Sequence, residues 1–87
     1  MEKEIKIKLT THADVKIAQR NIPIQLIRSV VTNPDKLEVD KFDRNLTHYI
    51  KKVDQKFLRV ITKLEKDKTI VVISAFYDRR LKIKRGL

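Results

Sequence analysis

The sequence predicts an α+β fold in which two N-terminal helices pack on an antiparallel sheet of about four strands. Three observations lead to this class. The chain has 87 residues, the size of one domain. Its first half carries apolar residues at helical spacing, and its second half alternates apolar and polar residues between turn signals at roughly ten-residue spacing. Residues 1–87 are therefore expected to form a single domain.

The first half predicts a short extended segment and two helices. Residues 4–9 alternate between apolar and charged side chains, which indicates either a half-buried strand or an extended lead-in. Thr11 is a suitable N-cap for a helix over residues 12–20. Pro23 breaks that helix and fits the first turn of a second helix over residues 23–32.

The second half predicts a meander of strands. Its alternating segments are separated by polar turns, and the last of them is apolar on both faces, which favours a central position in the sheet. The expected strands are residues 37–42, 46–53, 57–64 and 69–77. Beyond them the chain becomes basic, so residues 79–87 are expected to form a basic C-terminal segment, as a short edge strand or a tail.

Charge is the strongest functional signal in the composition. The chain holds 21 lysines and arginines against 11 acidic residues, a formal net charge of +10. These positive side chains repel one another in the folded chain, which lowers its stability. A polyanionic partner is the simplest explanation for such an excess of positive charge. We expect RNA before DNA, with an anionic membrane surface or an acidic protein as alternatives. A highly charged, solvated surface would explain the number of charges but not their sign.

Several chemistries are excluded or disfavoured by what the sequence lacks. There is no cysteine, which rules out disulfides and thiolate ligands, and the single glycine stands near the end of the chain, which rules out glycine-rich phosphate loops. Two histidines without further ligands make a metal site improbable, and no cofactor is expected. No segment is apolar enough to span a bilayer, so a cytoplasmic protein without a membrane partner is expected.

The remaining chemistry is metal-independent cleavage of RNA. In that reaction the 2′-hydroxyl attacks the adjacent phosphate, and fixed cations stabilise the charge that develops on the phosphorane. Histidine, tyrosine or lysine can move the protons. Arg59 is the leading candidate, because an arginine inside an apolar strand must reach the sheet surface or be paired. It shares its strand face with Phe57 and Ile61.

Further candidates are predicted around Arg59. Proposed catalytic residues are Arg59, His12, Tyr77 and Lys52, and proposed nucleic-acid contacts are Arg20, Lys51, Arg79, Arg80 and Lys82. Simpler interpretations stand beside these roles. His12 can be an ordinary helix-start residue, Arg20 can complement a helix dipole, and Lys51 and Lys52 can be solvated lysines. His48 is interpreted as a solvent-facing strand residue, without a catalytic role.

The order of several short motifs resembles the RelE/ParE-like toxin superfamily, near its small BrnT-like branch, a domain of unknown function. The resemblance spans about residues 9–80 and is carried by Thr11-His12-Ala13, Arg20-x-Ile22, Asn33-Pro34, Leu58-Arg59-Val60-Ile61, Ile70 to Ile73 and Ala75 to Arg80. It implies a toxin fold, cleavage of mRNA, often on the ribosome, and neutralisation by a cognate antitoxin. ParE-like relatives inhibit gyrase instead, so fold alone does not determine function.

The resemblance also bears on the candidate residues. Arg59 matches the basic residue on the sheet of RelE-like toxins. Tyr77, with Arg79 or Arg80, matches more loosely, as does Lys51 or Lys52, whereas His12 and Arg20 match the small-domain branch.

The leading hypothesis is therefore a toxin with metal-independent endoribonuclease activity. It predicts that Arg59→Ala abolishes cleavage and leaves the fold intact. The alternative is a non-catalytic module that binds nucleic acid or a protein partner, and oligomers are possible under either hypothesis.

Overall fold

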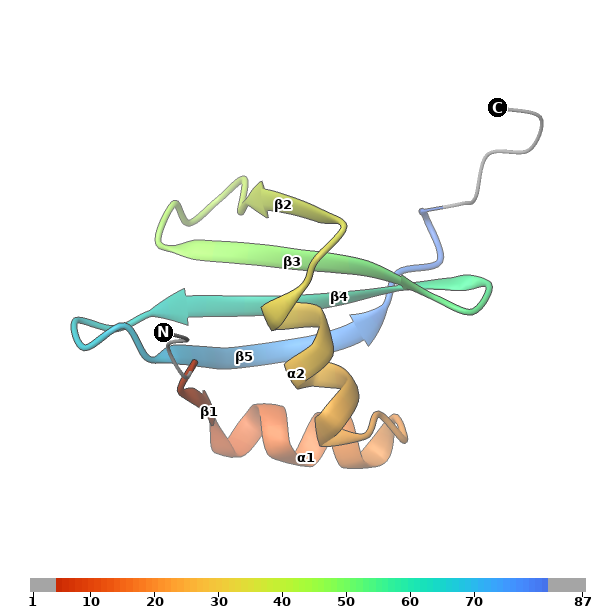
Figure 1. Ribbon diagram of the computed structural model, residues 1–87, viewed down its shortest axis with the longest axis horizontal. Helices are drawn as coiled ribbons and strands as arrows, with labels where there is room; N and C mark the ends of the chain where they lie inside the picture. Colours follow the sequence, from red (N-terminus) through yellow and green to blue (C-terminus); the bar gives the residue numbers. More distant parts are fainter. Residues whose placement is uncertain (1–4, 82–87) are drawn as a thin grey trace.

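The structure is a computed structural model and describes residues 5–81. In this part of the chain two helices are followed by most of the strands of a sheet (Figure 1). The elements in chain order are β1 (Ile7–Leu9), α1 (Thr11–Gln19), α2 (Ile24–Thr32), β2 (Lys36–Val39), β3 (Leu46–Val53), β4 (Lys56–Leu64) and β5 (Ile70–Tyr77). The α+β class is confirmed, and so is the order of helices before the meander. Among these residues no helix is both long and apolar enough to cross a membrane.

The sheet has five strands in the order β1-β5-β4-β3-β2, which corrects the expected count of about four. The meander from β2 to β5 is antiparallel, whereas β1 pairs with β5 in parallel. The extended start of the chain is thus a strand and not a lead-in. Ile70 N–H donates to Lys6 C=O over 2.8 Å at the start of this pairing, which covers part of the β5 edge.

The first helix is capped one residue earlier than the sequence predicts. Thr10, and not Thr11, is the N-cap, because Thr10 Oγ1 accepts a hydrogen bond from Ala13 N–H over 3.0 Å. After α1 the chain reverses through Asn21 at φ 56°, a conformation that asparagine tolerates better than most residues. Pro23 is the N-cap of α2, one residue before the first turn in which the sequence predicts it.

The apolar core lies between the two helices and one face of the sheet. Ala13 and Ile17 of α1 and Ile27 of α2 pack into one cluster with side chains of β4 and β5. In Figure 1, α2 lies in front of the sheet, with α1 along its lower edge. The buried members of this cluster are Ala13, Ile17, Ile22, Ile27, Val30, Val31, Leu58, Val60, Ile70, Val72 and Ala75.

The strand register decides which side chains reach the other face. Leu58 and Val60 belong to the core, so Arg59 between them points away from the helices. We call the side of the sheet opposite the helices the open face. Arg59 pairs there with Ile50 of β3 and Phe76 of β5. A register shift between Ile61 and Thr62 interrupts the β4–β5 ladder, which resumes at Thr62 and Val72.

Candidate functional site

Arg59 stands at the centre of the open face yet is only 7% exposed. Its cross-strand neighbours are Ile50 and Phe76, and Phe57 and Ile61 flank it along β4. A guanidinium in such a surrounding is costly unless its charge is paired and its N–H groups have acceptors.

Two carboxylates pair with the Arg59 guanidinium and accept its N–H groups. Arg59 Nε donates to Asp78 Oδ2 over 2.8 Å, and Arg59 Nη1 donates to Glu38 Oε1 over 3.1 Å. Asp78 follows β5 and Glu38 lies on β2, so the sheet brings together groups far apart in sequence. Arg59 thus links the first and the last strand of the antiparallel meander.

His48 joins the same network from β3. Its Nδ1 lies 2.8 Å from Arg59 Nη1, and its Nε2 lies 2.6 Å from Asp40 Oδ1. Because a guanidinium can only donate, Nδ1 must accept, which leaves the ring proton on Nε2 to be donated to Asp40. Asp40 therefore fixes the tautomer and orientation of the imidazole, whose side chain is 14% exposed.

The surrounding donors keep two of these carboxyls ionised. Hydrogen bonds from Lys36 and then Arg59 hold the pKa of Glu38 below its usual range. A hydrogen bond from His48 does most to lower the pKa of Asp40. Both groups are carboxylates at neutral pH, so they act as acceptors only.

Asp78 is the most deeply placed carboxyl of the network. Burial works to raise its pKa, but hydrogen bonds from Arg80 and Arg59 outweigh burial, and the pKa of Asp78 is lowered. The hydrogen bond with Asp78 likewise raises the pKa of Arg80. The Arg80 side chain is nevertheless 82% exposed, so a tethered cation faces solvent beside the network.

The network forms the floor of an open groove of about 530 Å³. Its lining includes Lys41 and Phe42 of the β2–β3 loop and Arg80 and Leu81 of the segment after β5. Among the described residues, the groove is lined by these two segments, the end of β2 and side chains of the open face: Glu38, Val39, Asp40, Lys41, Phe42, His48, Arg59, Asp78, Arg80 and Leu81. Acceptors, an imidazole and a solvent-facing arginine thus converge on one hollow, as binding sites require.

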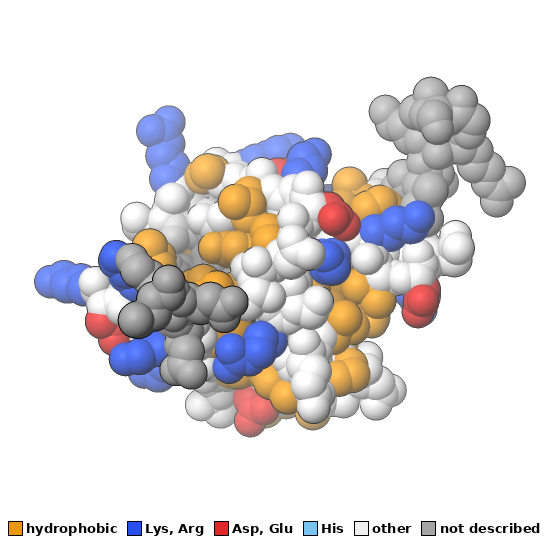
Figure 2. All heavy atoms as spheres, viewed as in Figure 1, with side chains coloured by type: hydrophobic (Ala, Val, Ile, Leu, Met, Phe, Trp, Pro, Cys, Tyr) orange, Lys and Arg blue, Asp and Glu red, His pale blue; other side chains and the backbone are white. Residues whose placement is uncertain are grey.

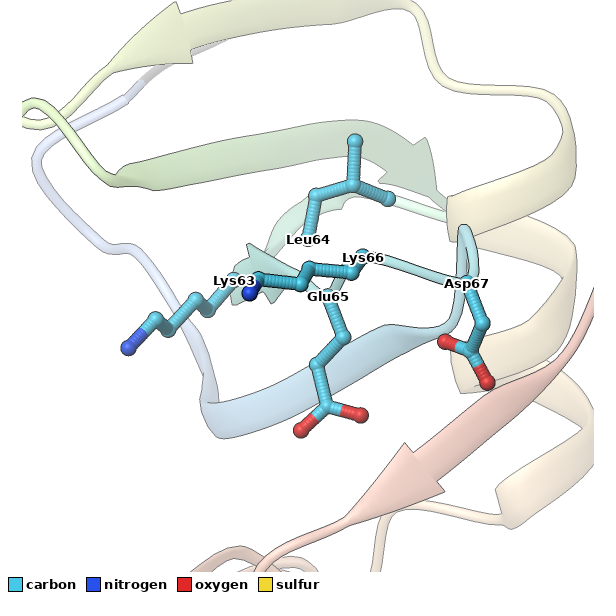
Figure 3. A pocket seen from close by; sticks show the side chains of 5 residues that line it. All are labelled: Lys63, Leu64, Glu65, Lys66 and Asp67. Carbon is cyan, nitrogen blue, oxygen red and sulfur yellow. The ribbon is translucent and has the colours of Figure 1, made fainter.

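A second hollow, of about 490 Å³, lies at the β4–β5 hairpin and lacks this convergence. Figure 3 shows its five consecutive residues, with Leu64 and Glu65 pointing in opposite directions and Lys63 and Asp67 turned outward. All five are exposed, and within residues 5–81 no side chain of another element lines the hollow. We therefore take the groove as the candidate site.

The structure brings three of the predicted residues to the open face. Arg59 and Arg80 line the groove. Lys52 lies on the same face further along β3, opposite Phe57, and is exposed. Arg79 follows β5 and is also exposed, but it does not line the groove.

Two other predicted residues have structural partners outside the groove. Lys51 Nζ donates to Asn33 C=O over 2.8 Å, which satisfies a carbonyl at the C-terminal end of α2. Arg20 Nη1 donates to Ala75 C=O over 2.8 Å. Asp78 N–H bonds to Phe57 C=O, and ladder bonds alternate, so Ala75 directs its carbonyl away from β4 and Arg20 satisfies it at the free edge.

Tyr77 and His12 are not brought to Arg59. Tyr77 pairs with Leu58 and packs against the core, so it lies on the helix side of the sheet, where Lys56 Nζ is 5.1 Å from its ring. His12 is exposed in the first turn of α1. The structure thus does not assemble the expected catalytic set of Arg59, His12, Tyr77 and Lys52. Lys82 lies outside the described residues.

Sequence reasoning missed most of the residues around Arg59. His48 lies on the open face but is not the solvent-facing residue that the sequence predicts, because its side chain is only 14% exposed and both of its ring nitrogens are engaged. Glu38, Asp40, Asp78 and Phe42 were not candidates. One signal was present: an arginine within an apolar strand requires acidic partners, and few acidic residues lie in or next to the expected strands, among them Glu38 and Asp78.

Basic side chains are not confined to the groove side. Figure 2 views the helix-bearing side, where lysine and arginine side chains are spread around the perimeter with apolar side chains between them. On the open face the register places Lys8, Lys52 and Lys63, all exposed. Charge alone therefore does not locate a ligand. Within residues 5–81 no group of three or more metal-ligating side chains is present.

Fold and site together define a small basic α+β domain whose open sheet face carries a polar groove. The chain belongs to the family described as Domain of unknown function (DUF4258), which matches residues 9–77. No curated protein and no solved structure shows a significant match to the chain.

Proposed function

We propose that the protein is a toxin-like endoribonuclease that cleaves mRNA without a metal ion, with the groove as its active site. The observation that carries the proposal is the His48–Arg59 pair, which places a neutral imidazole and a guanidinium 2.8 Å apart beside the exposed Arg80. The net charge of +10 supports a polyanionic substrate. The resemblance to RelE/ParE-like and BrnT-like toxins supports RNA, on or off the ribosome, and a cognate antitoxin partner.

The roles follow from the geometry of the groove. A substrate phosphate attracts the guanidinium groups of Arg80 and Arg59. As Arg59 Nη1 moves toward the phosphate, its hydrogen bond with His48 breaks and the lone pair of His48 Nδ1 becomes free. His48 then accepts the proton of the 2′-hydroxyl as its oxygen attacks phosphorus. The 5′-oxygen leaves and takes up a proton from water, and the two guanidinium groups stabilise the phosphorane. Asp40 holds the imidazole as its charge develops.

A second candidate function is a binding module without catalysis. It is favoured by the saturation of the network, since Arg59 is already paired with two carboxylates and both His48 nitrogens are engaged. In this case the network stabilises the sheet, and the exposed cations bind nucleic acid or an acidic protein.

Incubation of the protein with RNA in EDTA, with and without ribosomes, tests the first function. We expect cleavage by the wild type, a decrease of roughly 100-fold or more in His48→Gln, and unchanged cleavage in the matched control His12→Gln. Loss of cleavage in His12→Gln alone would move the active site to the start of α1.

No cleavage under either condition would contradict the endoribonuclease. Salt-sensitive binding of single-stranded RNA would then support the binding module. Circular dichroism of each variant establishes that the fold is retained.

A further inference from the structure

Phe42 is the most exposed large apolar side chain of the described residues, at 96%. Phe42 also lines the groove. Its loop is held in place, because Asp40 Oδ2 accepts hydrogen bonds from Phe42 N–H over 3.0 Å and from Asp43 N–H over 2.9 Å. An exposed ring on a hydrogen-bonded loop beside the groove offers a nucleobase a surface to stack on.

The carboxylates on the floor differ in how much acceptor capacity remains. Asp78 is buried and bonded by Arg59 and Arg80 on both oxygens, and Asp40 is bonded by His48 and two backbone N–H groups. Glu38 accepts one hydrogen bond on Oε1 from Arg59 and one on Oε2 from Lys36.

Each Glu38 oxygen therefore keeps a lone pair. The Glu38 side chain is also 37% exposed. Glu38 is thus the one carboxylate of the floor that can accept two further N–H groups from a ligand.

We propose that the groove binds a guanine base, which stacks on Phe42 and donates its N1–H and N2–H groups to Glu38. Guanine is the common base that offers two adjacent donors, and a carboxylate accepts such a pair in bidentate fashion. Arg80, which also lines the groove, contacts the phosphate group of the bound nucleotide, as in the proposed reaction. A groove of about 530 Å³ has room for a mononucleotide. The proposal rests on the proposed function only in taking RNA as the natural ligand.

Guanosine monophosphate, with adenosine monophosphate as its matched control, tests the site without RNA. We expect guanosine monophosphate to shift the NMR signals of Phe42, Glu38 and Arg80, and to bind more tightly than adenosine monophosphate. Phe42→Ala should weaken binding roughly five-fold or more, and Phe42→Trp should restore it. Glu38→Gln should remove the preference for guanine. Leu37→Ala, which truncates an exposed apolar side chain outside the groove, is the control variant.

Short single-stranded RNAs that contain one guanine or one adenine in a uridine context separate this inference from the proposed function. Equal affinity for the two RNAs, with no effect of Phe42→Ala, would overturn the guanine site and leave RNA binding standing. Guanosine monophosphate bound in the groove by a protein that neither binds nor cleaves RNA would support the guanine site and contradict the endoribonuclease. Absence of any shift with guanosine monophosphate would overturn the guanine site outright.

Discussion

At position 59 a guanidinium occupies a place whose nearest strand neighbours are Ile50, Phe57 and Phe76. In such a surrounding the ion pairs with Asp78 and Glu38 offset the cost of removing the charge from water. The residue that the sequence indicates as catalytic is therefore also a structural residue. This revises the expectation that Arg59→Ala leaves the fold intact.

We expect Arg59→Ala to lower the free energy of unfolding by about 3–5 kcal/mol, because it leaves the buried Asp78 carboxylate without its one buried cationic partner among the described residues. Arg79→Ala removes the same charge from an exposed position and should change stability by no more than about 0.5 kcal/mol. Urea denaturation of both variants measures the difference. Equal midpoints would show that Asp78 does not depend on Arg59. A loss of RNA cleavage in Arg59→Ala must therefore be compared with His48→Gln.

The sequence predicts that the partners of Arg59 are carboxylates, but it does not predict which ones. An arginine between apolar residues requires carboxylate partners, and this requirement follows from the local sequence. The identity of these carboxylates depends on the register of β2 with β3 and of β4 with β5, which no local pattern encodes. For the same reason Tyr77, close to Arg79 and Arg80 in sequence, faces the helices instead of the groove.

The helices and the antiparallel strands follow the periodicity of the sequence, because each pattern records which face of one element is buried. β1 is different. Three residues are too few for a distinctive pattern, and its partner β5 lies far along the chain, so only the tertiary fold decides between a strand and a lead-in. The start of α1 was ambiguous because two threonines stand side by side at positions 10 and 11.

These two threonines give a matched test of the helix boundary. Thr10→Ala should lower stability by about 1 kcal/mol, because Ala13 N–H loses its acceptor at the N-terminus of α1. Thr11→Ala, inside the helix and exposed, should be neutral or slightly stabilising because alanine is the better helix former. Thermal or urea unfolding of the pair measures both effects. The opposite order would place the cap at Thr11.

For the molecule as a whole, the sign and size of the charge were available from composition, but its distribution was not. Basic side chains occupy both the helix-bearing side and the open face, so their long-range attraction for a polyanion would not orient that polyanion. Orientation would have to come from short-range contacts. Among the described residues, the groove offers such contacts on the open-face side of the sheet, through Glu38, His48 and Arg80.

If long-range attraction acts on both faces but short-range contacts act only near the groove, charge reversals of equal size on the two faces should have unequal effects on RNA binding. Lys52→Glu with Lys63→Glu alters the open face, and Arg28→Glu with Lys56→Glu makes the same change in net charge on the helix side. Both pairs weaken long-range attraction. Only the open-face pair should also reduce the slope of log affinity against log salt concentration, by about 0.7 for each phosphate of a single strand that the variant no longer neutralises.

Fluorescence anisotropy with one labelled single-stranded RNA over a series of salt concentrations measures both slopes. A reduced slope in the open-face pair alone would place the RNA across the sheet, because counterion release counts only the phosphates that are neutralised in the complex. Equal slopes in the two double variants would contradict binding across the open face. A smaller slope in the helix-side pair would place the RNA against the helices, on the side where Tyr77 and Lys56 lie.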